Sequence, residues 1–291
     1  MEEVERYLPG TGFVEDKAAA IPVSDPLLVT GLGVYETLKV RGGVLFFPER
    51  HIARLYSSAR IIGVPVPYDQ KELEAHVLAF AAGVLAFAAG IPTSNFNIRL
   101  LYFGPRGDVA PELWALTNPP PFIDPSLYKT GCRVISFPGE RPLPTAKTLG
   151  TVLGAVAYAR ARGAGAYEAV FVNCGGKITE GTRSNVGFLA GRRLITAPDD
   201  MVLSGVTRET VLETALGAGI EVRKEAVSLD RVAEFDAAFV CSTSAAIVPV
   251  AQIDDVRFRR SDRTVLDELS TAYTSFLRDY ARTAPRIDHS T

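Results

Sequence analysis

The sequence predicts a protein of the α/β class with two domains, a small α+β domain followed by a larger α/β domain. Its 291 residues exceed what one core of ordinary size needs, and stretches of strand and helix character alternate along the chain. Three consecutive prolines in the stretch 118–125 fit neither a helix interior nor a central strand. We therefore expect a small domain over 1–120, a linker over 121–127 and a large domain over 128–291.

The small domain should combine strands with two helices. Glycines at 42 and 43 suit a hairpin turn between two apolar stretches, and apolar residues then recur at three- and four-residue spacing. The expected elements are strand-like sequence within 27–40, a strand at 44–47, helices over 48–62 and 68–90, and a strand over 96–103.

The large domain should alternate strands and helices, with glycine-containing turns between the strands. Gly163 is a natural stop for the first of its helices. The expected elements are strands at 132–137, 169–172, 185–189, 194–196, 220–223 and 237–241, and helices over 148–162, 207–216, 229–235 and 263–282.

Composition narrows the class of partner. A net charge of −2 and a pI near 6.0 argue against nucleic acid or an anionic membrane, which leaves small molecules. The apolar run 77–92 is shorter than the roughly 20 residues that cross a bilayer. Three separated cysteines and three scattered histidines predict neither a disulfide framework nor a metal site. The acidic start MEEVERYLPG is not a secretory signal, so we expect a cytoplasmic protein.

Lys147 is the first candidate for chemistry. It follows the proline-rich stretch 142–146, precedes a predicted helix and has apolar neighbours. Taken alone, such a lysine is ordinarily a surface residue. In desolvated surroundings, however, a lysine amine can attack a carbonyl and form an imine.

Glu180 lies in an unusual segment, ITEGTRSNVGF at 178–188, in which polar residues interrupt what would otherwise be one long strand. One interpretation is a β-bulge or edge turn, with Ser184 and Asn185 bonding their own backbone. The other is a kinked strand that aims Glu180 into a cleft. The residues alone leave both open.

Three further segments could bind an anion. Residues 204–207 (SGVT) precede a helix, as a plain N-cap or as a phosphate seat with free amides. Residues 242–244 (STS) follow an apolar strand, where ligand sites and solvated turns are both common. Arg54 is either a surface charge on a helix or a forked phosphate donor.

In their order along the chain, these segments resemble the class IV (fold type IV) pyridoxal-phosphate aminotransferases. That family includes D-amino-acid and branched-chain aminotransferases and aminodeoxychorismate lyases. The resemblance spans about residues 25–253 and rests on several ordered motifs: GVYETLKV at 33–40, HIARL at 51–55, TAKTLG around Lys147, YEAVFVN and ITEGTRSNVGFL within 167–189, SGVTRETV at 204–211 and FVCSTSAAIVPVAQID at 239–254.

The resemblance implies pyridoxal 5′-phosphate as cofactor, held in a cleft between the two domains of a homodimer, with no metal. Lys147 would form the Schiff base and Glu180 would pair with the pyridine nitrogen. Arg54, Val206, Thr207 and Thr243 would bind the cofactor phosphate, the Ser244 amide would face phosphate or substrate carboxylate, and Tyr35 would line the substrate pocket. Amino acids and 2-keto acids would be the substrates.

Within the family, the motifs GVYE and KTLGTVLG look more like the D-amino-acid group. Branched-chain enzymes carry a tyrosine five residues after the lysine, and this chain has Val152 there. Transamination of branched-chain L-amino acids is the second candidate, and aminodeoxychorismate lyase the third. A non-catalytic cofactor-binding scaffold is the alternative from another class, but it would need neither Lys147 nor Glu180.

The site for the substrate carboxylate departs from the family pattern. The R-x-H motif of well-known D-amino-acid enzymes is absent from the strand 97–102 (NIRLLY), and Ala246 replaces the usual acidic residue. We expect Arg183 or Arg99 to supply this contact, with Arg41 at the rim. A surface role for each of these arginines remains open.

Overall fold

The computed structural model describes residues 6–8, 12–14, 20–87, 95–107 and 109–287. The chain divides into two compact units. The first comprises Met1–Pro121, Ala146–Gly150 and Ala281–Thr291, and the second comprises Phe122–Thr145 and Thr151–Tyr280. Both contain sheets and helices, so the expected α/β class is confirmed.

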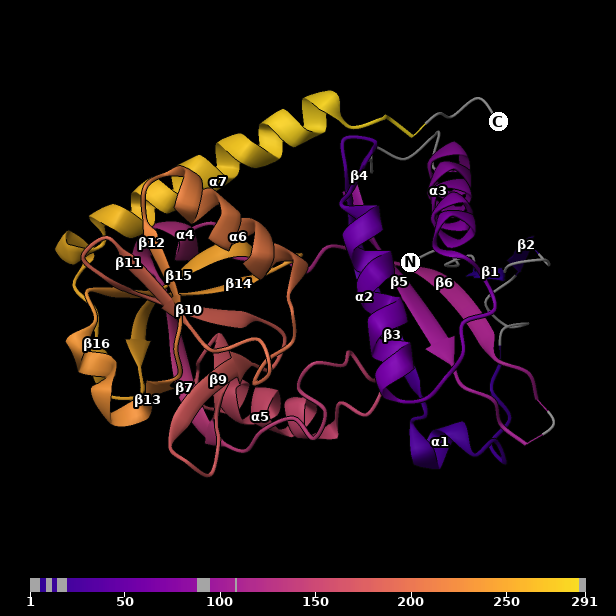
Figure 1. Ribbon diagram of the computed structural model, residues 1–291, viewed down its shortest axis with the longest axis horizontal. Coiled ribbons are helices and arrows are strands. Elements are labelled where there is room, and N and C mark those ends of the chain that lie inside the picture. The colour runs from indigo at the N-terminus through magenta and orange to yellow at the C-terminus, as the bar shows by residue number, and fades with distance from the viewer. Residues whose placement is uncertain (1–5, 9–11, 15–19, 88–94, 108, 288–291) are drawn as a thin grey trace. The chain divides into compact units, whose positions relative to one another are not determined.

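The first unit is built on an antiparallel sheet with the strand order β2-β1-β6-β5-β3-β4 (Figure 1). Its elements are β1 (Arg6–Leu8), β2 (Gly12–Val14), α1 (Leu27–Thr30), β3 (Gly33–Arg41), β4 (Val44–Phe46), α2 (Pro48–Ile61), α3 (Gln70–Phe87), β5 (Asn95–Phe103) and β6 (Glu112–Asn118).

The two faces of β3 differ in character. Val34, Leu38 and Val40 are fully buried and pack with apolar residues of α2 and α3. The intervening side chains from Tyr35 to Arg41 are half-buried and belong to the opposite face of the sheet. This strand therefore presents a helix-covered apolar face and a more polar face.

The second unit is built on a larger sheet in which β9 also pairs with β10, so that β10, β14, β15, β7, β8 and β9 form a closed ring of strands. Its elements are α4 (Leu127–Thr130), β7 (Cys132–Pro138), α5 (Val152–Gly163), β8 (Glu168–Val172), β9 (Lys177–Gly181), β10 (Asn185–Ala190), β11 (Arg193–Thr196), α6 (Val206–Gly217), β12 (Glu221–Lys224), β13 (Val227–Ser228), the 3₁₀ helix η1 (Leu229–Glu234), β14 (Ala237–Ser242), β15 (Ala246–Ile253), β16 (Val256–Arg257), η2 (Arg260–Asp262) and α7 (Thr264–Thr283).

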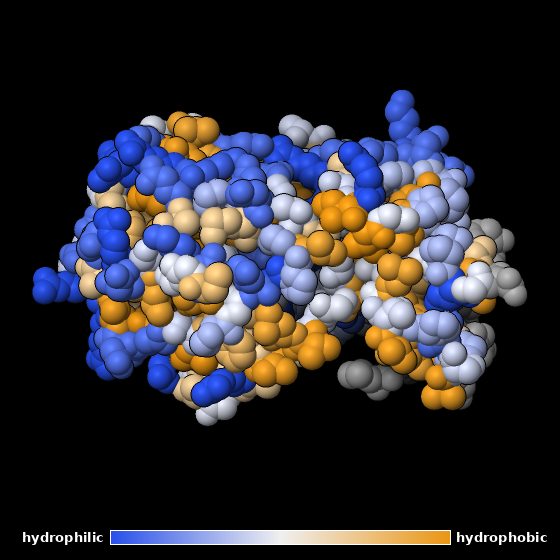
Figure 2. Space-filling view, turned by 60° about the horizontal axis from the view of Figure 1, so that its bottom comes forward, coloured by the Kyte–Doolittle hydropathy of each residue, from blue (hydrophilic) through white to orange (hydrophobic). Residues whose placement is uncertain are grey.

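The helices of the second unit pack on its strands by their apolar sides. Residues of α6 and α7 form one core with β10, β11, β14 and β15, and α5 packs its buried alanines against β8. The other side of α5 is open, because Val152 is 76% and Val156 54% exposed. Orange hydrophobic groups also stand among blue residues on the surface shown in Figure 2.

One local prediction was wrong, and the structure decides one alternative that the residues left open. The helix expected from residue 148 begins at Val152, because Thr148 pairs with Val34 as a short antiparallel bridge. Of the two interpretations of the segment 178–188, the turn is the one found: β9 and β10 form a tight hairpin, with Glu180 opposite Asn185, and not one kinked strand. The end of the helix expected over 68–90 lies outside the described residues.

Within the described parts of the chain, no helix is long and apolar enough to cross a membrane. The same residues contain no cluster of three or more histidine, cysteine or acidic side chains that could hold a metal ion.

Candidate active site

The segment that carries Lys147 is attached to β3 as an additional short strand. The amide of Tyr35 donates to the carbonyl of Lys147 at 3.0 Å, and the amide of Leu149 donates to the carbonyl of Gly33 at 3.0 Å. Gly33 allows this close approach: a Cβ there would lie 2.6 Å from Cδ1 of Leu149 and 2.5 Å from the carbonyl oxygen of Tyr102. The lysine is therefore held by the sheet and not by a helix.

The lysine is also fixed from the side of α2. Its backbone amide donates to the hydroxyl of Ser58, a fully buried residue, at 3.0 Å. The amine Nζ lies 4.4 Å from the centroid of the Tyr35 ring. Half-buried Lys147 thus presents its primary amine beside an aromatic ring on the more polar face of β3.

Arg54 belongs to a buried ionic cluster under the opposite face of β3. Its Nε and Nη2 atoms donate to the two oxygens of Glu36 at 2.6 and 2.8 Å, and Nδ1 of His51 lies 2.8 Å from the same carboxylate. Burial raises the pKa of Glu36, but Arg54 and His51 outweigh it and hold that pKa far below its ordinary value. Burial lowers the pKa of His51, partly offset by Glu36.

The more polar face of the first sheet gathers cationic side chains. Arg99 on β5 pairs with Thr37 and is exposed on the same face as Tyr35. Lys39 belongs to this face as well, and burial, with a smaller contribution from Arg41, lowers its pKa to about 8. Arg41 itself donates to the carbonyls of Val40 and Phe96 and to the side chain of Asn97.

Glu180 is buried at the start of the β9–β10 turn, with its side chain 5% exposed. Its Oε2 accepts the amide of Leu203 at 3.2 Å, and its Oε1 accepts Nη1 of Arg141 at 3.3 Å. The turn itself is held by Glu168, which accepts the hydroxyls of Thr182 at 2.6 Å and Ser184 at 3.0 Å. The carboxylate of Glu180 thus has a fixed position in the sheet.

The first turn of α6 is suited to an anion. Gly205 is its N-cap and no side chain caps the helix, so Val206 and Thr207 open it with backbone amides and the positive end of the helix dipole. Gly205 is packed so closely that a Cβ would lie 2.0 Å from Oδ1 of Asn185. The Thr207 side chain hydrogen-bonds Tyr273 of α7.

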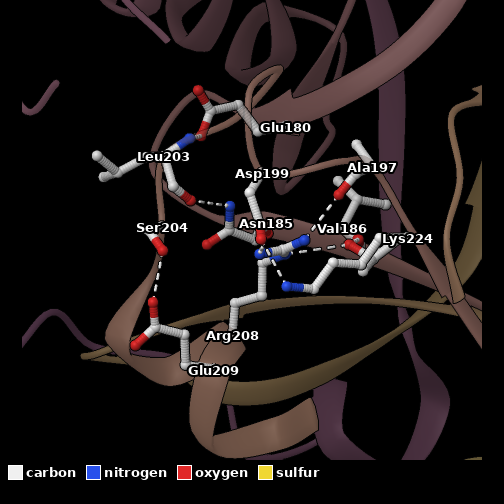
Figure 3. A network of polar contacts seen from close by, with 11 residues as sticks. Glu180, Asn185, Val186, Ala197, Asp199, Leu203, Ser204, Arg208, Glu209 and Lys224 are labelled. Carbon is white, nitrogen blue, oxygen red and sulfur yellow. Dashed lines mark hydrogen bonds and ion pairs between the residues drawn. The ribbon is translucent and has the colours of Figure 1, made fainter. Parts of the chain in front are cut away.

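Arg208 anchors the same turn from within the unit (Figure 3). Only 3% exposed, it donates to the carbonyl of Ala197 at 2.7 Å and to Asp199 at 2.7 Å, and Lys224 also pairs with Asp199. These contacts join the start of α6 to the end of β11, so the amides of this turn occupy a fixed position.

The remaining predicted residues lie in turns of the second unit. Thr243 and Ser244 are half-buried in the turn between β14 and β15, which Ser242 closes through the amide of Ala245 at 3.2 Å. Arg183 is exposed at the β9–β10 turn, with its guanidinium 3.8 Å from the centroid of the Tyr158 ring.

Sequence reasoning missed several residues that hold these groups in place. Glu36 could have been found, because it is a charge at a position of β3 whose neighbours in register are apolar. His51 and Ser58 share the buried side of α2 with Leu55, a helical spacing that signals an inward polar group. Nothing local marks Asn185 or Arg141, whose partners are distant in the sequence.

Comparison with known proteins gives the family. Residues 33–253 match the family model described as amino-transferase class IV. A protein of Methanocaldococcus jannaschii named "Putative branched-chain-amino-acid aminotransferase" is 32% identical over 85% of this chain and 87% of its own length. A D-alanine aminotransferase of Bacillus licheniformis is 29% identical over 83% of this chain and 86% of its own length.

Solved structures share the fold. A branched-chain aminotransferase of Thermoproteus uzoniensis superposes with a TM-score of 0.82 at 24% identity, covering 99% of this chain and 100% of the other. A hypothetical aminotransferase of Mycobacterium tuberculosis in its PLP-bound form gives 0.80 at 23% identity, covering 93% and 98%. The family match over residues 33–253, with the relatives that resemble most of the chain, identifies it as a member of the class IV aminotransferases, enzymes that depend on pyridoxal 5′-phosphate.

Proposed function

We propose that this enzyme moves the amino group of D-amino acids to 2-keto acids. The observation that carries the preference is Val152, which stands five residues after the lysine where the branched-chain enzymes carry tyrosine. Transamination of branched-chain L-amino acids is the second candidate, favoured by the name of the relative in Methanocaldococcus jannaschii.

The residues of the chain fit the cofactor in three respects. The amides that open α6 suit its phosphate, with Thr243, Ser244 and Arg54 as further proposed phosphate contacts. The carboxylate of Glu180 suits the protonated pyridine nitrogen, and the amine of Lys147 suits the aldehyde. When bound, the cofactor supplies an electron-withdrawing ring that stabilises the charge left when an α-proton departs.

Lys147 has the catalytic part in this proposal. With the cofactor bound, its neutral Nζ would carry a proton between the α-carbon of the substrate and the C4′ carbon of the cofactor. The ring of Tyr35 lies 4.4 Å from Nζ and limits where the amine can go. Glu180 would keep the pyridine nitrogen protonated, and the phosphate contacts would anchor the cofactor.

Arg99 is the arginine that we propose for the substrate carboxylate. It is exposed on the face of the sheet that carries Tyr35, and Lys39 adds positive charge there. The guanidinium of Arg41 bonds backbone carbonyls, and that of Arg183 stacks on Tyr158. These contacts leave Arg99 the better placed of the three.

A half-reaction screen tests the substrate preference. The purified yellow enzyme is mixed with paired D- and L-forms of alanine, glutamate and leucine, and the loss of its visible band is followed. Faster loss with the D-forms is expected, whereas faster loss with L-leucine would replace the proposal with the second candidate. Pyruvate release from aminodeoxychorismate would favour the lyase instead.

The Lys147→Ala variant tests the transaminase mechanism itself. It should fold and retain no turnover, because no other group is proposed to move the α-proton. Substantial residual transamination would refute the role of Lys147.

We also propose a cytoplasmic homodimer. The exposed apolar side chains on α5, including Val152 and Val156, are consistent with burial against a second copy. A mass of about one chain from light scattering on the eluted protein would contradict the dimer.

A further inference from the structure

One residue of the second unit, Leu203, is held through both of its backbone polar groups. The amide of Leu203 donates to Oε2 of Glu180 at 3.2 Å, and the carbonyl of the same residue accepts Nδ2 of Asn185 at 3.0 Å. Figure 3 shows Leu203 between these two side chains. Glu180 and Asn185 are themselves opposite partners in the β9–β10 hairpin, so this pair of residues bonds the two consecutive peptide groups that flank the Cα of Leu203.

The same asparagine contacts the start of α6. Gly205, two residues after Leu203, has φ −71 and ψ 123, which any residue can adopt. What requires glycine there is space, because a Cβ would stand 2.0 Å from Oδ1 of Asn185. The buried Asn185, which is 7% exposed, therefore contacts the loop before α6 at two places, the carbonyl of Leu203 and Gly205.

A second set of contacts, made by Arg208, holds the first turn of α6 against the end of β11. This guanidinium bonds the carbonyl of Ala197 at 2.7 Å and Oγ1 of Thr196 at 3.4 Å, while that hydroxyl donates to the carbonyl of Val186 on β10. Asn185 is the residue before Val186 in β10. Strand β10 therefore locates the start of α6 by two independent routes.

We propose that Asn185 is a positioning residue that sets the place of the α6 amides relative to the carboxylate of Glu180. These two groups are the proposed partners of the phosphate and the pyridine nitrogen of one cofactor, whose ends are a fixed distance apart. An error in their spacing weakens one contact or the other. This inference rests on the proposed roles of Glu180 and α6.

The first test replaces Asn185 with alanine and measures the affinity of the full-length protein for pyridoxal 5′-phosphate by equilibrium dialysis. The loss of a buried donor leaves the carbonyl of Leu203 without its partner, and we expect affinity to fall on the order of tenfold. The pH midpoint of the bound cofactor's visible band should shift as well, because Glu180 loses its place relative to the ring.

Asn173→Ala is the matched control. Asn173 also uses its side chain to hold backbone, accepting the amides of Gly175 and Lys177 at 3.0 Å each, but it does so in the β8–β9 turn. The control should lower the melting temperature while leaving cofactor affinity and the spectral midpoint unchanged. A purely structural role for Asn185 would give the same pattern as the control and would overturn the proposal.

A second variant, Gly205→Ala, keeps Asn185 and adds one methyl group against it. Alone it should weaken cofactor binding on the order of tenfold, since the loop must shift away from Oδ1. In the Asn185→Ala background the contact with Oδ1 is gone and the tightest one that remains is 3.3 Å, to Cβ of Arg208, so the second change should add less than it does alone. If the fold-loss of affinity in the double variant equals the product of the losses in the two single variants, the inference is overturned.

The outcomes separate this inference from the proposed function. Wild-type protein that takes up no pyridoxal 5′-phosphate contradicts the cofactor roles themselves. If the wild type, Asn185→Ala and Gly205→Ala all bind the cofactor with equal affinity, only the positioning role is contradicted.

Discussion

Replacing Glu36 with glutamine should destabilise the first unit strongly. The carboxylate is fully buried and accepts Arg54 at 2.6 and 2.8 Å and the amide of Thr37 at 3.1 Å, with His51 Nδ1 at 2.8 Å. A neutral amide of the same shape cannot balance the guanidinium of Arg54, whose side chain is only 10% exposed. The variant therefore loses the buried negative charge that both of these guanidinium contacts use, while the guanidinium itself stays buried.

The size of the effect follows from that burial. Removing one partner of a buried ion pair costs about 3–5 kcal/mol in unfolding free energy. Each 1 kcal/mol shifts the melting temperature of a chain near this size by roughly 2–4 °C. We expect cofactor-free Glu36→Gln to melt about 6–20 °C below the wild type in a circular dichroism or calorimetric scan.

Glu72→Gln provides the control on the same unit. Glu72 is 51% exposed near the start of α3 and its pair with His76 has a separation of 4.0 Å, so the change should be within about 1 kcal/mol. The reasoning is refuted if Glu36→Gln and Glu72→Gln melt at the same temperature. That result would mean that the buried cluster contributes no more than a surface pair.

Three further predictions follow from the geometry. The pKa values of Glu36 and His51 are both lowered from their ordinary 4.5 and 6.5, so each group binds fewer protons in the folded state than in the unfolded state. The unfolding free energy should therefore fall as the pH drops below about 6.5, and fall again below about 4.5. Denaturation across a pH series measures this, and an unfolding free energy that does not change with pH would contradict it. Gly33→Ala should lower the unfolding free energy by about 1–3 kcal/mol and reduce turnover, because the added Cβ would clash with Leu149. Calorimetry and an activity assay measure the two effects, and a variant that matches the wild type in both would contradict the prediction. Ala246→Gly should raise unfolding free energy by about 0.5–1 kcal/mol, since Ala246 has φ 55, and an unaltered or lower melting temperature would contradict the strain.

The sequence predicted the elements that local pattern governs. The helix expected over 48–62 is α2, Pro48–Ile61, because its apolar spacing and the proline at its start act within the segment. The strand expected over 96–103 is β5, Asn95–Phe103. Strands β6 and β15 were not predicted, although both contain apolar runs.

Long-range pairing accounts for the local errors. Thr148 has helix-compatible neighbours, yet its pairing with Val34 keeps the lysine segment extended, and no spacing within 142–152 reveals that partner. Likewise the polar turn between β9 and β10 is stabilised by Glu168, a residue of another strand.

The candidate site shows the same division between local and distant information. The start of α6 was recognisable, since Gly205 precedes a helical pattern and leaves amides free of a side-chain cap. The hydrogen bond from Asn185 to the carbonyl of Leu203 was not recognisable, because the donor lies on β10 and the acceptor lies in the loop before α6. One of the two interpretations that the sequence left open had Asn185 bonding its own backbone.

The most direct test of the account is the attachment site of the cofactor. The protein loaded with pyridoxal 5′-phosphate is reduced with borohydride, digested and mapped by mass spectrometry. The account predicts a phosphopyridoxyl group on Nζ of Lys147 and none in Lys147→Ala. A label on another lysine, or a yellow protein that acquires no label, would contradict it.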